Sequence, residues 1–196
     1  MEFQTSATQY LTRLRAVLDQ FDLAMYERMV NEILDAYDRQ AQIFVMGNGG
    51  SAATASHLAC DINKGCCLDL TKKFKMICLN DNIPTLLAYA NDISYAAVFE
   101  EQLKNFFNPG DLVIGISGSG NSENVLRAVR YAAANNGRTI GWSGFGGGKL
   151  ATLVDLPFVI QSHDMQKVED LHIILCHMLM QHLYKTLNGK EAAGAC

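Results

Sequence analysis

One stretch, residues 44–61, constrains the possible folds of this chain more than any other. It starts with the apolar run Phe44–Met46, passes through a glycine-rich turn at Gly47–Gly50, and continues as a small-residue segment typical of a helix. A strand, a turn and a helix in this order form the basic unit of an α/β protein. The first N–H groups of such a helix lack intrahelical partners and lie at the positive end of its dipole. The stretch therefore predicts an α/β fold with an anion-binding turn.

Apolar runs of strand length alternate with helical patterns from residue 41 onward. The predicted strands are Gln42–Met46, Lys75–Leu79, Leu112–Ile116, Arg138–Trp142 and Leu156–Ile160. The main predicted helices are Ser51–Asn63, Ile83–Ala90, Tyr95–Phe107, Glu123–Ala134 and Met165–Leu187. This alternation predicts a three-layer α/β/α sandwich with a five-stranded parallel sheet. Ligands of such sheets bind beyond the carboxyl ends of the strands.

Residues 1–40 precede the first strand and show helical spacing of apolar residues in two segments, Tyr10–Leu18 and Leu23–Leu34. This helical pair must bury its apolar faces against the rest of the domain or against a second subunit, and we favour packing between subunits. The chain is interpreted as one domain over residues 1–196. It consists of the helical pair 1–40, the α/β core 41–187 and a short tail 188–196.

Composition narrows the classes of function. The formal net charge of −4 argues against binding to nucleic acid or to an acidic membrane surface. No apolar run is long enough to span a bilayer, and the first residues lack the basic start and apolar core of a signal peptide. The six cysteines show no paired C-x-x-C spacing, which is typical of reduced thiols. We predict a cytoplasmic protein without nucleic-acid or membrane partners.

A second polar turn follows the predicted strand Leu112–Ile116. It contains Ser117, Gly118, Ser119 and Ser122 within the run SGSGNS, and a helix follows it. Hydroxyl and backbone N–H groups together can surround a phosphate without any lysine. The alternative is an ordinary helix cap at Ser122 with turn glycines, but one serine would be enough for that. The three serines at this edge of the sheet favour a phosphate-binding turn.

The first turn indicates which class of phosphate compound is involved. Its glycines, Gly47, Gly49 and Gly50, lack the G-x-G-x-x-G spacing of a dinucleotide fold. The motif GK[ST] of nucleotide P-loops is also missing from this turn. The sequence therefore favours a sugar phosphate over a nucleotide.

Two predicted helices carry candidate metal ligands. His57 and Asp61 are four residues apart on one helix face, and Glu169 and His177 are close in helical phase on the last helix. Two histidines and two carboxylates from two helices would suit a tetrahedral zinc ion. The alternative is that these are packing or surface residues, because nothing in the spacing requires the two helices to meet.

Other polar residues have simpler interpretations. His172 and His182 are interpreted as packing or surface residues. The pair Asn91–Asp92 follows a predicted helix. It marks either a plain helix end or a loop whose side chains hold sugar hydroxyls.

The run GNGGS at 47–51, the pair Asn91–Asp92, the turn SGSGNS at 117–122 and the pattern E-D-L-H-x4-H at 169–177 together resemble the sugar isomerase (SIS) domain family. Within it, the chain is most similar to the phosphoheptose isomerases, and the likeness covers nearly the whole chain. The resemblance implies an aldose–ketose isomerase that converts sedoheptulose 7-phosphate to a manno-heptose 7-phosphate for lipopolysaccharide and other cell-surface glycans. It also implies a homotetramer with active sites between subunits.

The resemblance assigns roles to individual residues. Phosphate contacts would come from Ser51, Ser117, Gly118, Ser119 and Ser122. Sugar contacts would come from Asn48, Gly49, Gly50, Asn91 and Asp92, with Glu169 also counted among the substrate-binding residues. Zinc would be held by His57, Asp61, Glu169 and His177. Asp61 would be the base that takes the carbon proton, and His177 the opposing acid or base.

Two residues depart from the family pattern. Asp61 stands where the family has a glutamate, and its side chain is shorter by one methylene group. Glu169 stands where the family has a glutamine, which adds a negative charge beside the metal. Related SIS proteins without the full catalytic set bind sugar phosphates or protein partners without catalysis, so a phosphosugar-binding regulator is the alternative function. An isomerase of another sugar phosphate is a third. Because acids remain at both positions, an enzyme is favoured.

Overall fold

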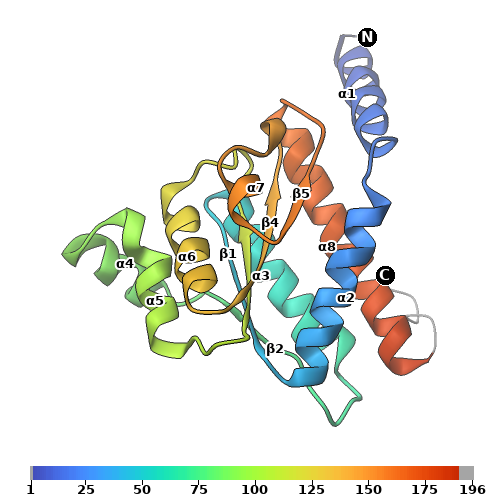
Figure 1. Ribbon diagram of the computed structural model, residues 1–196. Coiled ribbons are helices and arrows are strands. Elements are labelled where there is room, and N and C mark those ends of the chain that lie inside the picture. Colours follow the sequence, from blue (N-terminus) through green and yellow to red (C-terminus); the bar gives the residue numbers. More distant parts are fainter. Residues whose placement is uncertain (1, 190–196) are drawn as a thin grey trace.

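The computed structural model describes residues 2–189 and places a parallel sheet at the centre of the molecule (Figure 1). The five strands are β1 (Gln42–Met46), β2 (Lys75–Cys78), β3 (Leu112–Ile116), β4 (Arg138–Ser143) and β5 (Leu156–Val159). They are all parallel, in the order β2-β1-β3-β4-β5. The predicted α/β/α sandwich and its five strands are confirmed.

Helices cover both faces of the sheet because the strands are apolar on both sides. Ile43 and Val45 of β1 point into one core, while Phe44 and Met46 point into the other. The first core lies beneath α2 (Leu23–Arg39), α3 (Gly50–Cys60) and α8 (Met165–Asn188). The second lies beneath α5 (Val98–Phe106), α6 (Glu123–Ala134) and α7 (Leu150–Leu153). Figure 1 shows the two helical layers on opposite sides of the strands.

The strand order places the two glycine- and serine-rich turns side by side. β1 and β3 are neighbours, with Met46 paired to Gly115 at the end of their ladder. After β1 the chain passes to α3 on one face, and after β3 it passes to α6 on the other face. The two connections diverge at this point and leave a crevice, which is where open α/β sheets bind ligands.

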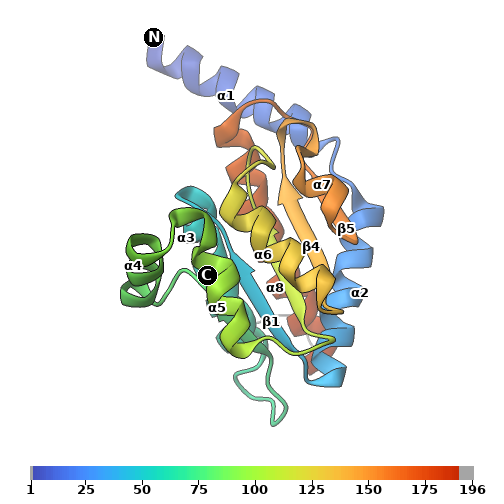
Figure 2. The ribbon, with the colours of Figure 1, turned by 60° about the vertical axis from the view of Figure 1, so that its left-hand side comes forward.

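The two N-terminal helices behave differently. α2 buries residues such as Met29 and Ile33 in the core of its own chain. In contrast, α1 (Glu2–Leu18) contains no buried residue and projects from the body in both views (Figures 1 and 2). α4 (Ile83–Asp92) also has no buried residue. The role of the helical pair in packing between subunits stays a prediction.

Several boundaries differ from the sequence-based expectation. The helix expected over Ser51–Asn63 is α-helical to Cys60 and then widens into the π-helix η1 (Asp61–Cys66). Of the two interpretations of Asn91–Asp92, the helix end is correct and the loop is wrong, because both residues form the last turn of α4, two residues beyond the expected end at Ala90. The N-terminus of that helix is stabilised by the Asn82 side-chain cap and by Pro84 in the first turn. The helix propensities of Asn and Asp are not low enough to end it two residues earlier.

Short helices were also missing from the prediction. The segment expected as one helix over Tyr95–Phe107 opens with the 3₁₀-helix η2 (Tyr95–Ala97), and η3 (Phe145–Gly147) lies within the expected flexible turn. The expected tail begins inside α8, and its residues 190–196 lie outside the described part of the chain. In the part that is described, no helix combines the length and hydropathy needed to cross a bilayer.

Candidate functional site

The serine turn after β3 is closed by its own hydrogen bonds. Ser117 Oγ donates to Ser122 Oγ at 3.0 Å, and the Gly120 N–H donates to the Ser117 carbonyl at 2.8 Å. Gly120 has φ of +67°, and an added Cβ would lie 2.0 Å from the Gly147 carbonyl oxygen, so only glycine fits here. Although Ser122 precedes α6, its side chain makes no capping hydrogen bond. The simple explanation of this turn as a helix cap therefore fails.

The two turns line one cavity of about 280 Å³ at the carboxyl edge of the sheet. Its walls are formed by Asn48, Gly49, Gly50, Ser51, Ile116, Ser117, Gly118, Ser119, Ser122, Met165 and Glu169. All phosphate residues expected from the sequence and the first three sugar-binding residues are thus brought together. Hydroxyl groups, glycine backbone and the start of α6 face a space without a basic side chain among its walls, which suits a phosphate held by hydrogen bonds.

The turn after β1 is faced by a carboxylate of the protein itself. Gly49 has φ of +55°, and Gly50 then begins α3. A Cβ added at Gly50 would lie 2.5 Å from Glu169 Oε1, so glycine is needed to admit this side chain. Glu169 therefore occupies the N-terminal end of α3, where a helix favours negative charge. A phosphate at the same place would meet like charge, which favours the serine turn as its seat.

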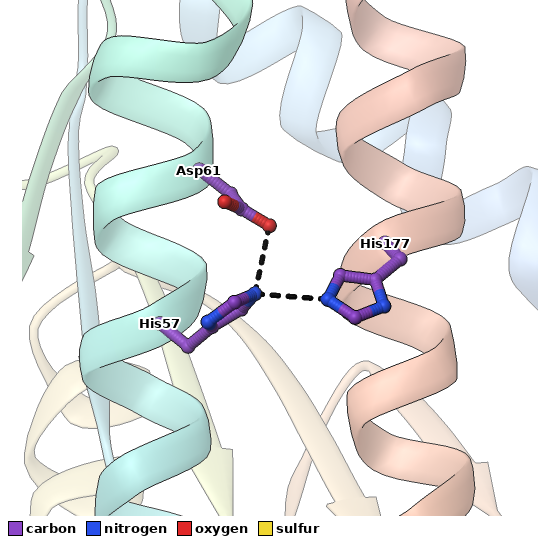
Figure 3. Close-up of side chains that lie close together, drawn as sticks. All are labelled: His57, Asp61 and His177. Carbon is purple, nitrogen blue, oxygen red and sulfur yellow. Dashed lines mark hydrogen bonds and ion pairs between the residues drawn. The ribbon is translucent and has the colours of Figure 1, made fainter. Parts of the chain in front are cut away.

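His57, Asp61 and His177 form a compact group between α3 and α8 (Figure 3). His57 Nε2 lies 3.0 Å from Asp61 Oδ2 and 3.0 Å from His177 Nε2. The side chains of His57 and Asp61 are 43% and 23% exposed, so the group is open to solvent and to small ligands. Asp61 is the first residue of the π-helix η1, a type of distortion that is frequent at functional sites.

The donor set of this group fits a divalent cation such as zinc. Two imidazole nitrogens and one carboxylate oxygen lie within 4.8 Å of one another. Ligands about 2.0–2.1 Å from a tetrahedral zinc ion are separated by about 3.3 Å, close to the observed distances. Three protein ligands with an open fourth position are typical of catalytic zinc. Glu169 is not a member of this compact group, so its expected role as a metal ligand stays a prediction.

A second cavity, of about 360 Å³, lies beside the metal-ligand residue His57. It is lined by Gly50, Ala53, Thr54, His57, Glu169, Asp170 and Ile173. Gly50 and Glu169 line both cavities. The two cavities are therefore adjacent, with the serine turn on one side of the Glu169 carboxylate and His57 on the other.

Comparison with known proteins identifies the family. The SIS domain matches residues 8–144. A phosphoheptose isomerase from Clostridium acetobutylicum is 35% identical over 165 residues, which cover 84% of this chain and 84% of that protein. The chain belongs to the SIS domain family, in the group of the phosphoheptose isomerases.

Two more comparisons agree with this placement. The phosphoheptose isomerase of Geotalea daltonii is 37% identical over 170 residues, which cover 83% of this chain and 84% of that protein. The solved structure of the phosphoheptose isomerase from Neisseria gonorrhoeae matches with a TM-score of 0.85 and 25% identity, over 93% of this chain and 98% of that one. The similarity thus covers most of the chain in both the sequence and the structure comparison.

Asn91 and Asp92 are the expected site residues that lie neither at the two cavities nor in the histidine–aspartate group. Both are exposed at the end of α4, and Asn91 Nδ2 donates to Asp92 Oδ1 at 2.8 Å. Neither residue lines the cavities described above. Their expected contact with the sugar stays a prediction.

Two asparagines that sequence reasoning missed support the first turn. Asn80 pairs with the Gly47 backbone in both directions, at 3.1 Å and 2.9 Å. Its position just beyond a predicted strand is a signal that sequence reasoning had available, since polar residues at strand carboxyl ends lie at the ligand edge. Asn124 is buried within α6 and pairs with Asn48. Nothing in its local sequence distinguishes it from a surface residue of that helix.

The remaining histidines and cysteines match their simple interpretations. His172 is 1% exposed and packs beside Trp142, with ring centroids 5.9 Å apart, while His182 lies on the surface near Tyr26. Among the described cysteines none forms a disulfide. Burial raises the pKa of the Cys66 and Cys176 thiols to about 12, which keeps them protonated and unreactive.

Proposed function

We propose that this protein is an aldose–ketose isomerase that converts sedoheptulose 7-phosphate to a manno-heptose 7-phosphate. Its curated relatives carry the name phosphoheptose isomerase at 35% and 37% identity. The observation that carries the proposal is the shared wall of the two cavities, formed by Gly50 and Glu169. A substrate with a phosphate at one end and a carbonyl at the other fits a site with those two ends.

The serine turn would anchor the phosphate. Ser117, Ser119 and Ser122 offer hydroxyl groups, and the turn backbone offers N–H groups at the start of α6. These groups bind the end of the substrate that does not react. Binding energy from such a remote group orients the reacting carbons and contributes to catalysis when it is realised in the transition state.

The histidine–aspartate group would act at the other end. Conversion of a ketose to an aldose takes a proton from C1 and returns a proton to C2 through an enediolate, while a hydroxyl proton moves between O1 and O2. We assign the removal of the carbon proton to the Asp61 carboxylate and, where His177 is not fully committed to a metal, the transfer of the hydroxyl proton to its imidazole. When bound at His57, Asp61 and His177, a zinc ion would act as a Lewis acid for the negative charge that develops on the sugar oxygens.

The oligomer and the cellular setting belong to the same proposal. Large apolar side chains are exposed on the helices without buried residues, among them Phe3 at 89% on α1 and Leu87 at 59% on α4. A homotetramer that buries these helices would also bring Asn91 and Asp92 of one subunit to the site of another. Free thiols in the described chain support a cytoplasmic setting.

The direct test is turnover of sedoheptulose 7-phosphate with the wild type, Asp61→Asn and His177→Ala. We expect turnover by the wild type, and losses of about 100-fold or more in both variants because general acid–base groups contribute about 10²–10⁴-fold. Asp69→Asn, which alters an exposed aspartate beyond the π-helix, is the matched control and should leave kinetics unchanged. Wild-type rates in both variants would reject the assigned roles.

Two further measurements separate the alternatives. A regulator without catalysis would bind the sugar phosphate yet exchange no deuterium at C1 or C2 in D₂O, whereas the isomerase exchanges it. Elemental analysis of untagged protein, followed by chelation, tests the metal. Protein without a bound divalent metal, whose activity is unchanged by chelator and by added zinc, would refute the zinc site. A screen of phosphorylated ketoses with five to seven carbons tests the chain length of the substrate.

A further inference from the structure

Two asparagine side chains connect the two turns of the site. Asn48 lies in the turn after β1, and Asn124 lies in the first turn of α6, just beyond Ser122. Asn48 Nδ2 donates to Asn124 Oδ1 at 2.9 Å, and Asn124 Nδ2 donates to Asn48 Oδ1 at 2.9 Å. Asn124 is only 3% exposed, so its amide is removed from water and depends on this pairing.

The orientation of both amides follows from one backbone donor. The Val125 N–H points at Asn124 Oδ1 at 3.0 Å, and a backbone N–H can only donate, so this atom must be the oxygen. The other end of the Asn124 amide is then its NH₂ group, which requires an oxygen on Asn48. Tyr95 Oη, 2.6 Å from that same Asn48 oxygen, must therefore be a donor. The network has one consistent arrangement.

Few hydrogen-bonding groups of the two amides remain available to a ligand. Each amide oxygen accepts two hydrogen bonds, which fills its two lone pairs. Each NH₂ group donates once within the pair and keeps one N–H. Asn48 therefore has a single N–H to offer to a sugar, and its direction is set by Asn124 and Tyr95.

The pair acts where the sheet no longer holds the turns together. The β1–β3 ladder ends at Met46 and Gly115, before either turn begins. Beyond that point the first turn depends on Asn80, which holds the Gly47 backbone, and on the asparagine pair. Because the first turn and the serine turn hold opposite walls of one cavity, the pair sets the width of that cavity.

We propose that Asn124 is a positioning residue: through its amide pair with Asn48 it fixes the sugar-binding turn relative to the phosphate-binding turn. Asn124 lines neither of the two cavities described above and would act on the substrate through Asn48. The inference rests on the proposed isomerase function for its kinetic consequence. Its structural part, the fixed position of the first turn, holds independently of the reaction.

The decisive variant is Asn124→Asp, which has nearly the same shape. The aspartate can still accept from Val125 and from Asn48 Nδ2, and a carboxylate is favourable at the start of α6, so folding is retained. Its second oxygen, however, faces Asn48 Oδ1, and two acceptors repel. We expect kcat/KM for sedoheptulose 7-phosphate to fall about 10- to 100-fold, since a displacement of about 1 Å costs that much. Inhibition by inorganic phosphate, which chiefly probes the serine turn, should stay within about twofold.

Asn135→Asp is the matched control, because it makes the same change at the exposed far end of α6. It should leave kinetics unchanged. Tyr95→Phe removes the hydrogen bond from the exposed Tyr95 side chain to Asn48 Oδ1 and should give a smaller decrease in kcat/KM. The proposal is overturned if Asn124→Asp keeps kcat/KM within about threefold of the wild type, or if phosphate inhibition weakens in parallel with kcat/KM.

Hydrogen exchange separates this proposal from the proposed function. In Asn124→Asp, amides of residues 47–51 should exchange several times faster than in Asn135→Asp, while the rest of the sheet is unchanged. If the wild type fails to convert any sugar phosphate, the proposed function is wrong, yet this exchange result still decides the role of Asn124. Equal exchange in the two variants overturns the positioning role whatever the activity.

Discussion

Acid should destabilise this protein through one buried histidine. His172 is 1% exposed, and neither ring nitrogen has a hydrogen-bond partner among the described residues. Burial lowers the pKa of His172 from 6.5 to about 4, because the imidazolium form would lose its hydration. In the unfolded chain this side chain regains its ordinary pKa. The two states therefore bind different numbers of protons between these pH values.

The sign and size of the effect follow from proton linkage. As the pH falls from 7.5 to 5, the unfolded histidine becomes protonated while the folded one stays mostly neutral. The unfolded state binds more protons, so the free energy of unfolding decreases. With a pKa of 6.5 in the unfolded state and about 4 in the folded state, the loss at pH 5 is about 2 kcal/mol. Below pH 4 it approaches its limit of about 3 kcal/mol.

Urea unfolding at both pH values, with chelator and at one protomer concentration, measures this loss. His172→Gln and His172→Met cannot titrate, so the fall in unfolding free energy between pH 7.5 and 5 should be about 2 kcal/mol smaller than in the wild type. Other groups titrate equally in all proteins, and their contributions cancel in the difference. The exposed His163 supplies the control His163→Gln. A difference below about 0.5 kcal/mol in both His172 variants would refute the reasoning.

Two further perturbations test the contacts of α8. Gly50→Ala places a methyl carbon 2.5 Å from Glu169 Oε1, so the flexible carboxylate must move. We expect kcat/KM to fall about tenfold or more, with little change in the thermal midpoint of unfolding. Unchanged kinetics would contradict this placement of Glu169. Tyr10→Phe removes the 2.5 Å hydrogen bond from Tyr10 Oη to Asp170 Oδ2, which raises the pKa of Tyr10 to about 12 and ties α1 to α8. Amides of α1 should then exchange several times faster, and equal protection in hydrogen-exchange mass spectrometry would argue against the tie.

Local patterns were sufficient to predict the five strands and the main helices of this fold. Five apolar runs predicted the five strands, because parallel strands covered on both faces have no polar side. The glycine and serine turns were found because each follows such a run. What local patterns did not predict is the strand order, since any order of five similar strands would satisfy the same hydrophobic periodicity. In the observed order β2-β1-β3-β4-β5 the strands β1 and β3 are adjacent, so the two turns are neighbours and line one cavity.

In the candidate site, too, local spacing predicted some contacts while others depend on how the helices pack. The spacing of His57 and Asp61 placed both on one helix face, and the structure joins them at 3.0 Å. Whether His177 meets them depends on the packing of α3 against α8, which sequence spacing does not determine. The widening of the helix at Asp61 was not predictable either, because a π-helix differs from an α-helix only by a small change in local hydrogen bonding. The role of Asn124 was not predictable, because its partner Asn48 lies in the turn after β1 and not on α6.

The surroundings of Glu169 explain one of the two departures from the family pattern. A carboxylate in place of an amide adds a negative charge to the wall of the cavity, which by itself would make the site harder to form. The structure sets Glu169 against Gly50, where the dipole of α3 stabilises that charge without any basic side chain. A dianion placed beside Glu169 would meet like charge, so we expect the serine turn to carry most of the contacts to a phosphate. Glu169 lines both cavities, and its carboxylate would then lie between the predicted phosphate contacts and His57.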